Sequence, residues 1–102
     1  MIAITKIELS ERITDLIDKI FSTEDRDEVR HLLEIECAEN LPFCEDSNKY
    51  EMERIRISVL KLCEGNMDKL VAAIELAQID WRDLLMAAGF GYDTQAHKQW
   101  SP

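Results

Sequence analysis

The residues of this chain that come nearest to metal chemistry are two histidines and the carboxylates around them. Glu28 and His31 form a Glu-x-x-His pair, the unit found in di-iron bundles, where a second such pair and two further glutamates complete the site. His97 is the only other histidine, and Thr94 stands where its glutamate would be. Because the second pair is missing, we expect no di-iron centre.

A looser group of metal-binding side chains lies on the polar face of the helix expected around residues 22–39. It consists of Glu24, Asp27, His31 and Glu34. A run of charges on an exposed helical face is usually a solvated face, and divalent metals need convergent ligands. We therefore expect no bound metal and no other cofactor.

Catalytic motifs are absent from the sequence. No serine or cysteine stands in a nucleophile-elbow context, and there is no phosphate-binding loop and no zinc-protease pair of histidines. The glycines in "AAGFGYD" are placed as a helix stop rather than a phosphate cradle. The sequence predicts a protein that is not an enzyme, with no catalytic residue to nominate.

The cysteines and the N-terminal residues predict the compartment. Cys37, Cys44 and Cys63 are an odd number without the spacing of a disulfide framework, which indicates reduced thiols. The segment "MIAITKIELSE" lacks the basic start and long apolar run of a signal peptide. No stretch approaches the roughly 18 apolar residues of a membrane span. We expect a cytoplasmic protein that does not contact a membrane.

Charge is divided unevenly along the chain. The net charge is −9, and residues 1–53 hold 15 acids and 6 bases, whereas residues 54–102 hold 6 of each. An acidic surface repels phosphate backbones and anionic membranes and attracts basic protein faces. The alternative is that the acidity serves only solubility. The acids proposed for an interaction surface are Glu24, Asp25, Asp27, Glu28 and Glu34.

Aromatic residues gather in the C-terminal third, at Trp81, Phe90, Tyr92 and Trp100. They would either cap the core of a small bundle or form a partly exposed patch that binds a partner or a second copy of the chain. For the second interpretation, the candidate residues are Trp81, Arg82, Tyr92 and Trp100.

Hydrophobic periodicity predicts an all-α fold, a compact bundle of five to six helices without a sheet, as a single domain over residues 1–102. Only three glycines and two prolines occur, which leaves little turn chemistry for a β fold. The expected helices cover about 10–21, 22–39, 47–65, 67–78 and 80–89, with a last turn or two in 93–100. Residues 67–78 are apolar almost all round, so we expect them to be the least exposed. The alternative for the N-terminal residues is a short strand at "IAITKIEL".

Two charged residues interrupt the apolar faces of their helices. Glu36 falls within the apolar face of the second expected helix and Arg56 within that of the third. A charge in an apolar stripe is costly unless it is paired, and a single loop of about eight residues joins these helices. We predict that Glu36 and Arg56 form a partly buried ion pair, the alternative being that both line a polar pocket.

The stretch "EGNMDKLVAAIELAQIDWRDLLMAAGFG" resembles the helix-turn-helix of Fis-type DNA-binding domains. The matching features are Gly65-Asn66, Ala72-Ala73, Ile79, Leu84 and Gly89-Phe90. The spacing departs from that family: the alanine pair comes two residues late, the recognition helix is about three residues short, and Gln78 replaces a small turn residue.

The charges of that stretch also depart from DNA recognition. The would-be recognition helix opens Asp80-Trp81-Arg82-Asp83, with acids where a groove-facing helix needs bases. We therefore expect no nucleic-acid partner. A positive flank built from Arg54, Arg56 and Lys61 would favour DNA binding again.

The longer stretch from Glu53 to Phe90 is similar to small acidic bacterial proteins that carry no characterised function. The run Asp80-Trp81-Arg82-Asp83-Leu84-Leu85 is its distinctive part. This resemblance implies a bacterial, cytoplasmic source and brings no activity or site residue with it.

Three functions follow from these features. The first is a non-enzymatic protein–protein interaction module with an acidic N-terminal surface, in its most concrete form an inhibitor or immunity-type protein that binds a basic partner. The second is a helix-turn-helix-like DNA-binding regulator formed by residues 65–90. The third is an enzyme of unknown class, which would require a deep pocket lined by convergent polar groups.

Overall fold

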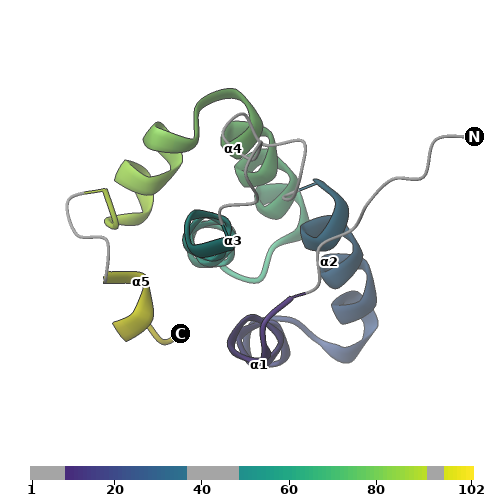
Figure 1. Cartoon of the computed structure of the whole chain (residues 1–102). Coiled ribbons are helices and arrows are strands. Elements are labelled where there is room, and N and C mark those ends of the chain that lie inside the picture. The colour runs from purple at the N-terminus through teal and green to yellow at the C-terminus, as the bar shows by residue number, and fades with distance from the viewer. Residues whose placement is uncertain (1–8, 37–48, 92–95) are drawn as a thin grey trace, which may run out of the picture.

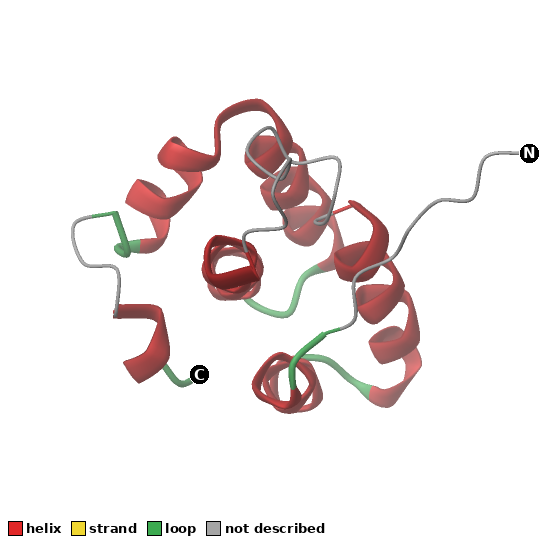
Figure 2. Ribbon diagram, viewed as in Figure 1, coloured by secondary structure: helices red, strands yellow, loops and turns green. Residues whose placement is uncertain are grey.

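A computed structural model describes residues 9–36, 49–91 and 96–102 of the chain. These residues form five α-helices: α1 (Glu11–Ile20), α2 (Thr23–Glu36), α3 (Lys49–Cys63), α4 (Met67–Ala88) and α5 (Ala96–Gln99). Within the described ranges there is no strand (Figure 2). The compact all-α fold is confirmed, and the strand considered at "IAITKIEL" lies almost wholly outside the described residues. No helix in the described ranges has both the length and the apolar character needed to cross a membrane.

The helix α3 lies at the centre of the molecule, with the other helices arranged around it (Figure 1). It contacts α1, α4 and α5, and α1 in turn contacts α2. From Met52 to Leu60 every residue of α3 is buried except Glu53. A helix covered on all sides needs apolar side chains on every face, or polar side chains whose hydrogen bonds are all made.

The expectation that residues 67–78 are the least exposed part of the chain is wrong. Val71 is 45% exposed, and Asp68, Lys69, Ala72 and Glu75 are also exposed. The first half of α4 packs on α3 through Leu70, Ala73, Ile74 and Ala77 and leaves its outer side to solvent. The first half of α4 is therefore apolar on several faces because alanine and aliphatic residues also stand on its solvent-exposed side, and not because it is buried.

The first helix is positioned by its cap and its apolar stripe. The Ser10 side chain accepts a hydrogen bond from the Ile13 amide at 3.2 Å, which satisfies one of the amides at the start of α1. The buried side chains Ile13, Leu16 and Ile17 face the core. The Ser10 hydroxyl also donates to a Glu53 carboxylate oxygen at 2.8 Å, which ties α1 to α3.

A break inside α4 divides it at Asp80, where the sequence predicts the start of a new helix. The backbone of Asp80 is extended (φ −152°, ψ 85°). Its Oδ1 accepts a hydrogen bond from the Asp83 amide at 3.2 Å, so Asp80 caps the second half. The two predicted helices are therefore confirmed as the two halves of one kinked helix.

The end of α4 also follows the prediction. Gly89 has a φ of +82°, its amide donates to the Met86 carbonyl, and the Phe90 amide donates to the Leu85 carbonyl at 2.9 Å. These two bonds form a Schellman motif. Phe90 is buried beneath it. The short α5 lies inside the predicted 93–100 turn, and the predicted end of the second helix near residue 39 lies outside the described residues.

Candidate interaction surface

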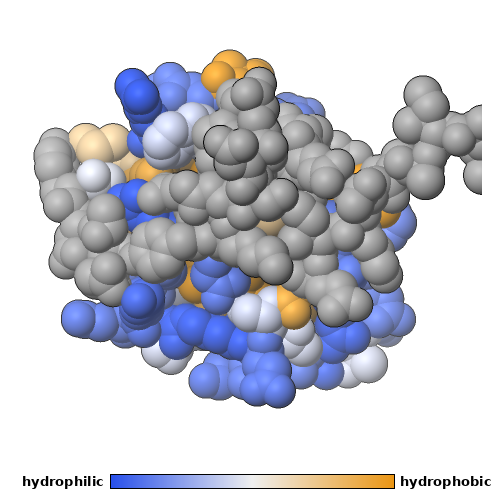
Figure 3. Space-filling view, viewed as in Figure 1, coloured by the Kyte–Doolittle hydropathy of each residue, from blue (hydrophilic) through white to orange (hydrophobic). Residues whose placement is uncertain are grey.

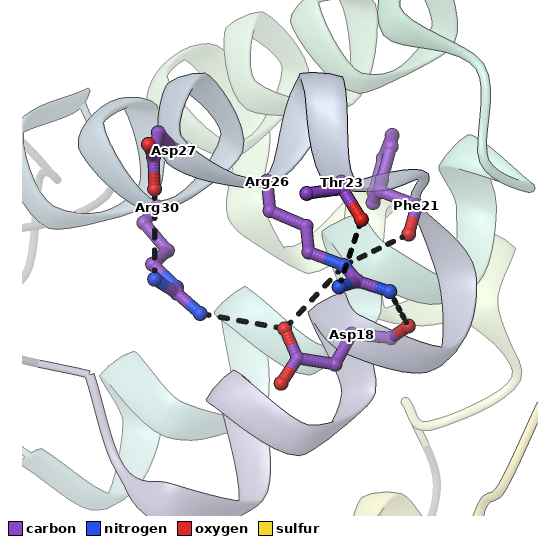
Figure 4. Close-up of polar contacts among 6 residues, drawn as sticks. All are labelled: Asp18, Phe21, Thr23, Arg26, Asp27 and Arg30. Atoms are coloured by element: carbon purple, nitrogen blue, oxygen red, sulfur yellow. Dashed lines mark hydrogen bonds and ion pairs between the residues drawn. The ribbon is translucent and has the colours of Figure 1, made fainter.

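The corner between α1 and α2 is held by Arg26 (Figure 4). Its Nε donates to the Phe21 carbonyl at 3.1 Å, and its Nη2 donates to the Asp18 carbonyl at 2.8 Å. These carbonyls lie at the C-terminal end of α1, where backbone acceptors lack helical partners and a cation is favoured. Arg26 is therefore committed to the fold and is not available to a partner.

The second arginine of α2, Arg30, is engaged by two aspartates. Its Nη2 lies 3.3 Å from Asp18 Oδ1, and its Nη1 lies 3.6 Å from Asp27 Oδ1 (Figure 4). The Asp27 side chain is 96% exposed, so this ion pair is screened and contributes little to stability. Its effect is on the surface charge, because it neutralises Arg30 on the side that faces solvent.

Three further bases donate to backbone carbonyls near the C-terminus, between residues 88 and 100. Arg12 donates to the Trp100 carbonyl at 2.6 Å and to the His97 carbonyl at 3.0 Å. Lys61 donates to the Ala88 carbonyl at 2.6 Å, and its Nζ also lies 4.7 Å from the centre of the Phe90 ring. Arg54 donates to the Phe90 carbonyl at 2.6 Å.

Two of the bases that the structure describes are buried, whereas Lys19, Lys69, Arg82 and Lys98 are exposed. Arg54 and Arg56 are buried, at 5% and 3% exposure. No aspartate or glutamate is buried among the residues whose side chains the structure describes. Among the described residues, exposed acids therefore outnumber exposed bases, in line with the net charge of −9.

The acids proposed from the sequence lie on α2 with different exposures. Glu24, Asp27 and Glu28 are exposed, and Asp25 and Glu34 are half-buried. Neither Glu24 nor Glu28 forms a hydrogen bond or ion pair with the described residues. Glu34 lines a shallow hollow of about 320 Å³ at the seam with α1, together with Leu9, Thr14 and Arg30.

Two further exposed acids lie on α1 and were not proposed as site residues. Glu11 and Asp15 are exposed, and they line a neighbouring hollow of about 290 Å³ with Leu9 and Thr14. Their signal was present in the sequence, because both lie opposite the apolar stripe of the first helix. Hydrophilic side chains cover the lower rim of the molecule, where α1 lies (Figure 3). We call the exposed carboxylates of Glu11, Asp15, Glu24, Asp27 and Glu28 the acidic face.

The aromatic candidates divide between core and surface. Phe90 is buried, whereas Trp81 and Trp100 pack against the core with part of each side chain exposed. The guanidinium of Arg82 lies 5.4 Å from the centre of the Trp81 ring, within the range of a cation–π contact. Tyr92 lies outside the described residues.

The predicted ion pair is described at one partner only. Arg56 is buried, as expected for a charged residue within an apolar stripe. The Glu36 side chain lies outside the described part of the chain, so the pair with Glu36 stays a prediction.

The histidines and the described cysteine do not converge. His31 is exposed on α2, and His97 is buried with its ring 6.4 Å from that of Phe90. No group of three or more His, Cys, Asp or Glu side chains in the described ranges is placed to hold a metal ion. Cys63 is buried, and its burial raises the pKa of its thiol.

Comparison with protein-family models, curated proteins and solved structures found no match.

Proposed function

We propose that the protein is a non-enzymatic interaction module whose acidic face docks on a basic protein. The observation that supports this proposal is a difference in commitment: several bases, such as Arg12 and Arg26, are bound to backbone carbonyls, while acids of α1 and α2 are exposed, among them Glu11, Asp15, Glu24 and Glu28. A surface of one sign raises the rate of encounter with a partner of the opposite sign.

The acids that contribute most to binding are the ones that have no partner among the described residues. Glu11, Asp15, Glu24 and Glu28 form no hydrogen bond or ion pair with the described residues, so a partner's lysine or arginine meets them without displacing another base. Asp18 and Asp27 are already held by Arg26 and Arg30. These two aspartates contribute to the negative electrostatic potential and do not contact the partner directly.

An inhibitor or immunity-type role is the concrete form of this proposal. The partner is a protein with a cationic functional site, such as one that binds nucleic acid, and the acidic face covers that site in place of phosphates. A cytoplasmic location in a bacterial cell is part of the same proposal.

The test compares two charge-reversed variants in a pull-down from the native cell at low salt. Glu24→Lys with Glu28→Lys reverses two exposed acids of the acidic face. Asp68→Lys with Glu75→Lys reverses two exposed acids of α4 and changes the net charge by the same amount. We expect the first variant to lose a basic protein that the wild type and the α4 variant both capture.

Two results would contradict the proposal. If both variants lose the partner equally, only net charge matters and the acidic face is not the site. If binding is insensitive to added salt, electrostatic attraction is not the mechanism, because exposed charges are screened within about 10 Å at 0.1 M ionic strength.

A further inference from the structure

We draw no further inference here: the strongest candidate, the shallow hollow between α1 and α2 lined by Leu9, Thr14, Arg30 and Glu34, carries nothing because nothing in the described residues shows what would occupy it.

Discussion

At the scale of single residues, the turn between α3 and α4 and the end of α4 each depend on a glycine with a left-handed backbone. Gly65 has a φ of +76°, and a Cβ at this position would lie 3.0 Å from the Ile20 carbonyl oxygen. Gly89 has a φ of +82°, but a Cβ there would meet only the end of the Lys61 side chain, at 3.5 Å. The two glycines thus share the conformation and differ in the space around them.

We predict that Gly65→Ala destabilises the protein more than Gly89→Ala does. The left-handed backbone alone costs a residue with a Cβ roughly 1–2 kcal/mol, and both variants carry that cost. Only Gly65→Ala also pushes against a backbone atom, which cannot rotate away as a lysine side chain can. Urea unfolding measures the two free energies of unfolding, and equal losses would show that the close approach to Ile20 is unimportant.

Cys63 makes the free energy of unfolding fall as the pH becomes alkaline. Burial is the largest cause of its raised pKa, and the thiol donates to the Leu60 carbonyl at 3.1 Å. The thiol of the unfolded chain ionises first, at an ordinary pKa of about 8.5, while the folded state still holds its proton. The contribution is therefore fully present below that pH and is lost as the pH rises through the folded pKa.

We predict that the free energy of unfolding falls between pH 8 and pH 10 more steeply in the wild type than in Cys63→Ala. The variant lacks the thiol, so the difference between the two pH profiles isolates this group from the lysines and tyrosines. Parallel profiles would show that Cys63 does not titrate differently in the folded and unfolded states.

At the scale of elements, the centre of the molecule is α3 rather than the more apolar α4. Ile57 in α3 is fully buried. It is buried because α3 has neighbours on several sides. Ile79, on the outer side of α4, is 82% exposed.

We predict that Ile57→Ala costs on the order of 2–5 kcal/mol of unfolding free energy, because it leaves a cavity in the core. Ile79→Ala removes the same atoms from solvent and should change stability by no more than about 0.5 kcal/mol. Thermal or urea unfolding of the two variants tests this difference. Similar losses at both positions would mean that α3 is not the centre of the fold.

At the scale of the whole molecule, the fate of the basic residues separates the two binding functions. A DNA-binding surface needs bases that can release counterions from phosphates. Arg54 and Arg56, two residues of the positive flank considered for residues 65–90, are buried, and Lys61 donates to Ala88. The break at Asp80 does divide α4 into two helices. The second of them starts with two acids, Asp80 and Asp83, and Arg54, Arg56 and Lys61 do not provide a positive flank for it.

We predict no measurable affinity for duplex DNA at physiological salt, because the would-be recognition helix opens with acids and Arg54 and Arg56 are buried. A gel-shift or fluorescence-anisotropy titration measures this directly, with a known DNA-binding protein as the positive control. Binding that weakens steeply as salt is added would contradict the prediction and would favour the helix-turn-helix interpretation.

The sequence by itself determined the features that depend on local chemistry. The Ser10 and Asp80 caps, the Schellman end at Gly89 and the apolar stripe of α1 each follow from residue type and short spacing, because capping and helical periodicity act over a few residues. The excess of acids in the first half was also readable directly. These features were enough to predict an all-α fold and the helix starts and stops within the described ranges.

Only the tertiary structure decided which helix is central and where the bases go. Arg12 reaches carbonyls more than 80 positions away, and Lys61 and Arg54 reach the end of α4. No local pattern marks such contacts, since they depend on which helix ends pack together. A carbonyl at the end of a helix attracts a cation from any element that packs nearby, and that neighbour is set by the fold as a whole. For the same reason the sequence could locate the exposed acids, but it could not show which bases are buried or bound to backbone carbonyls.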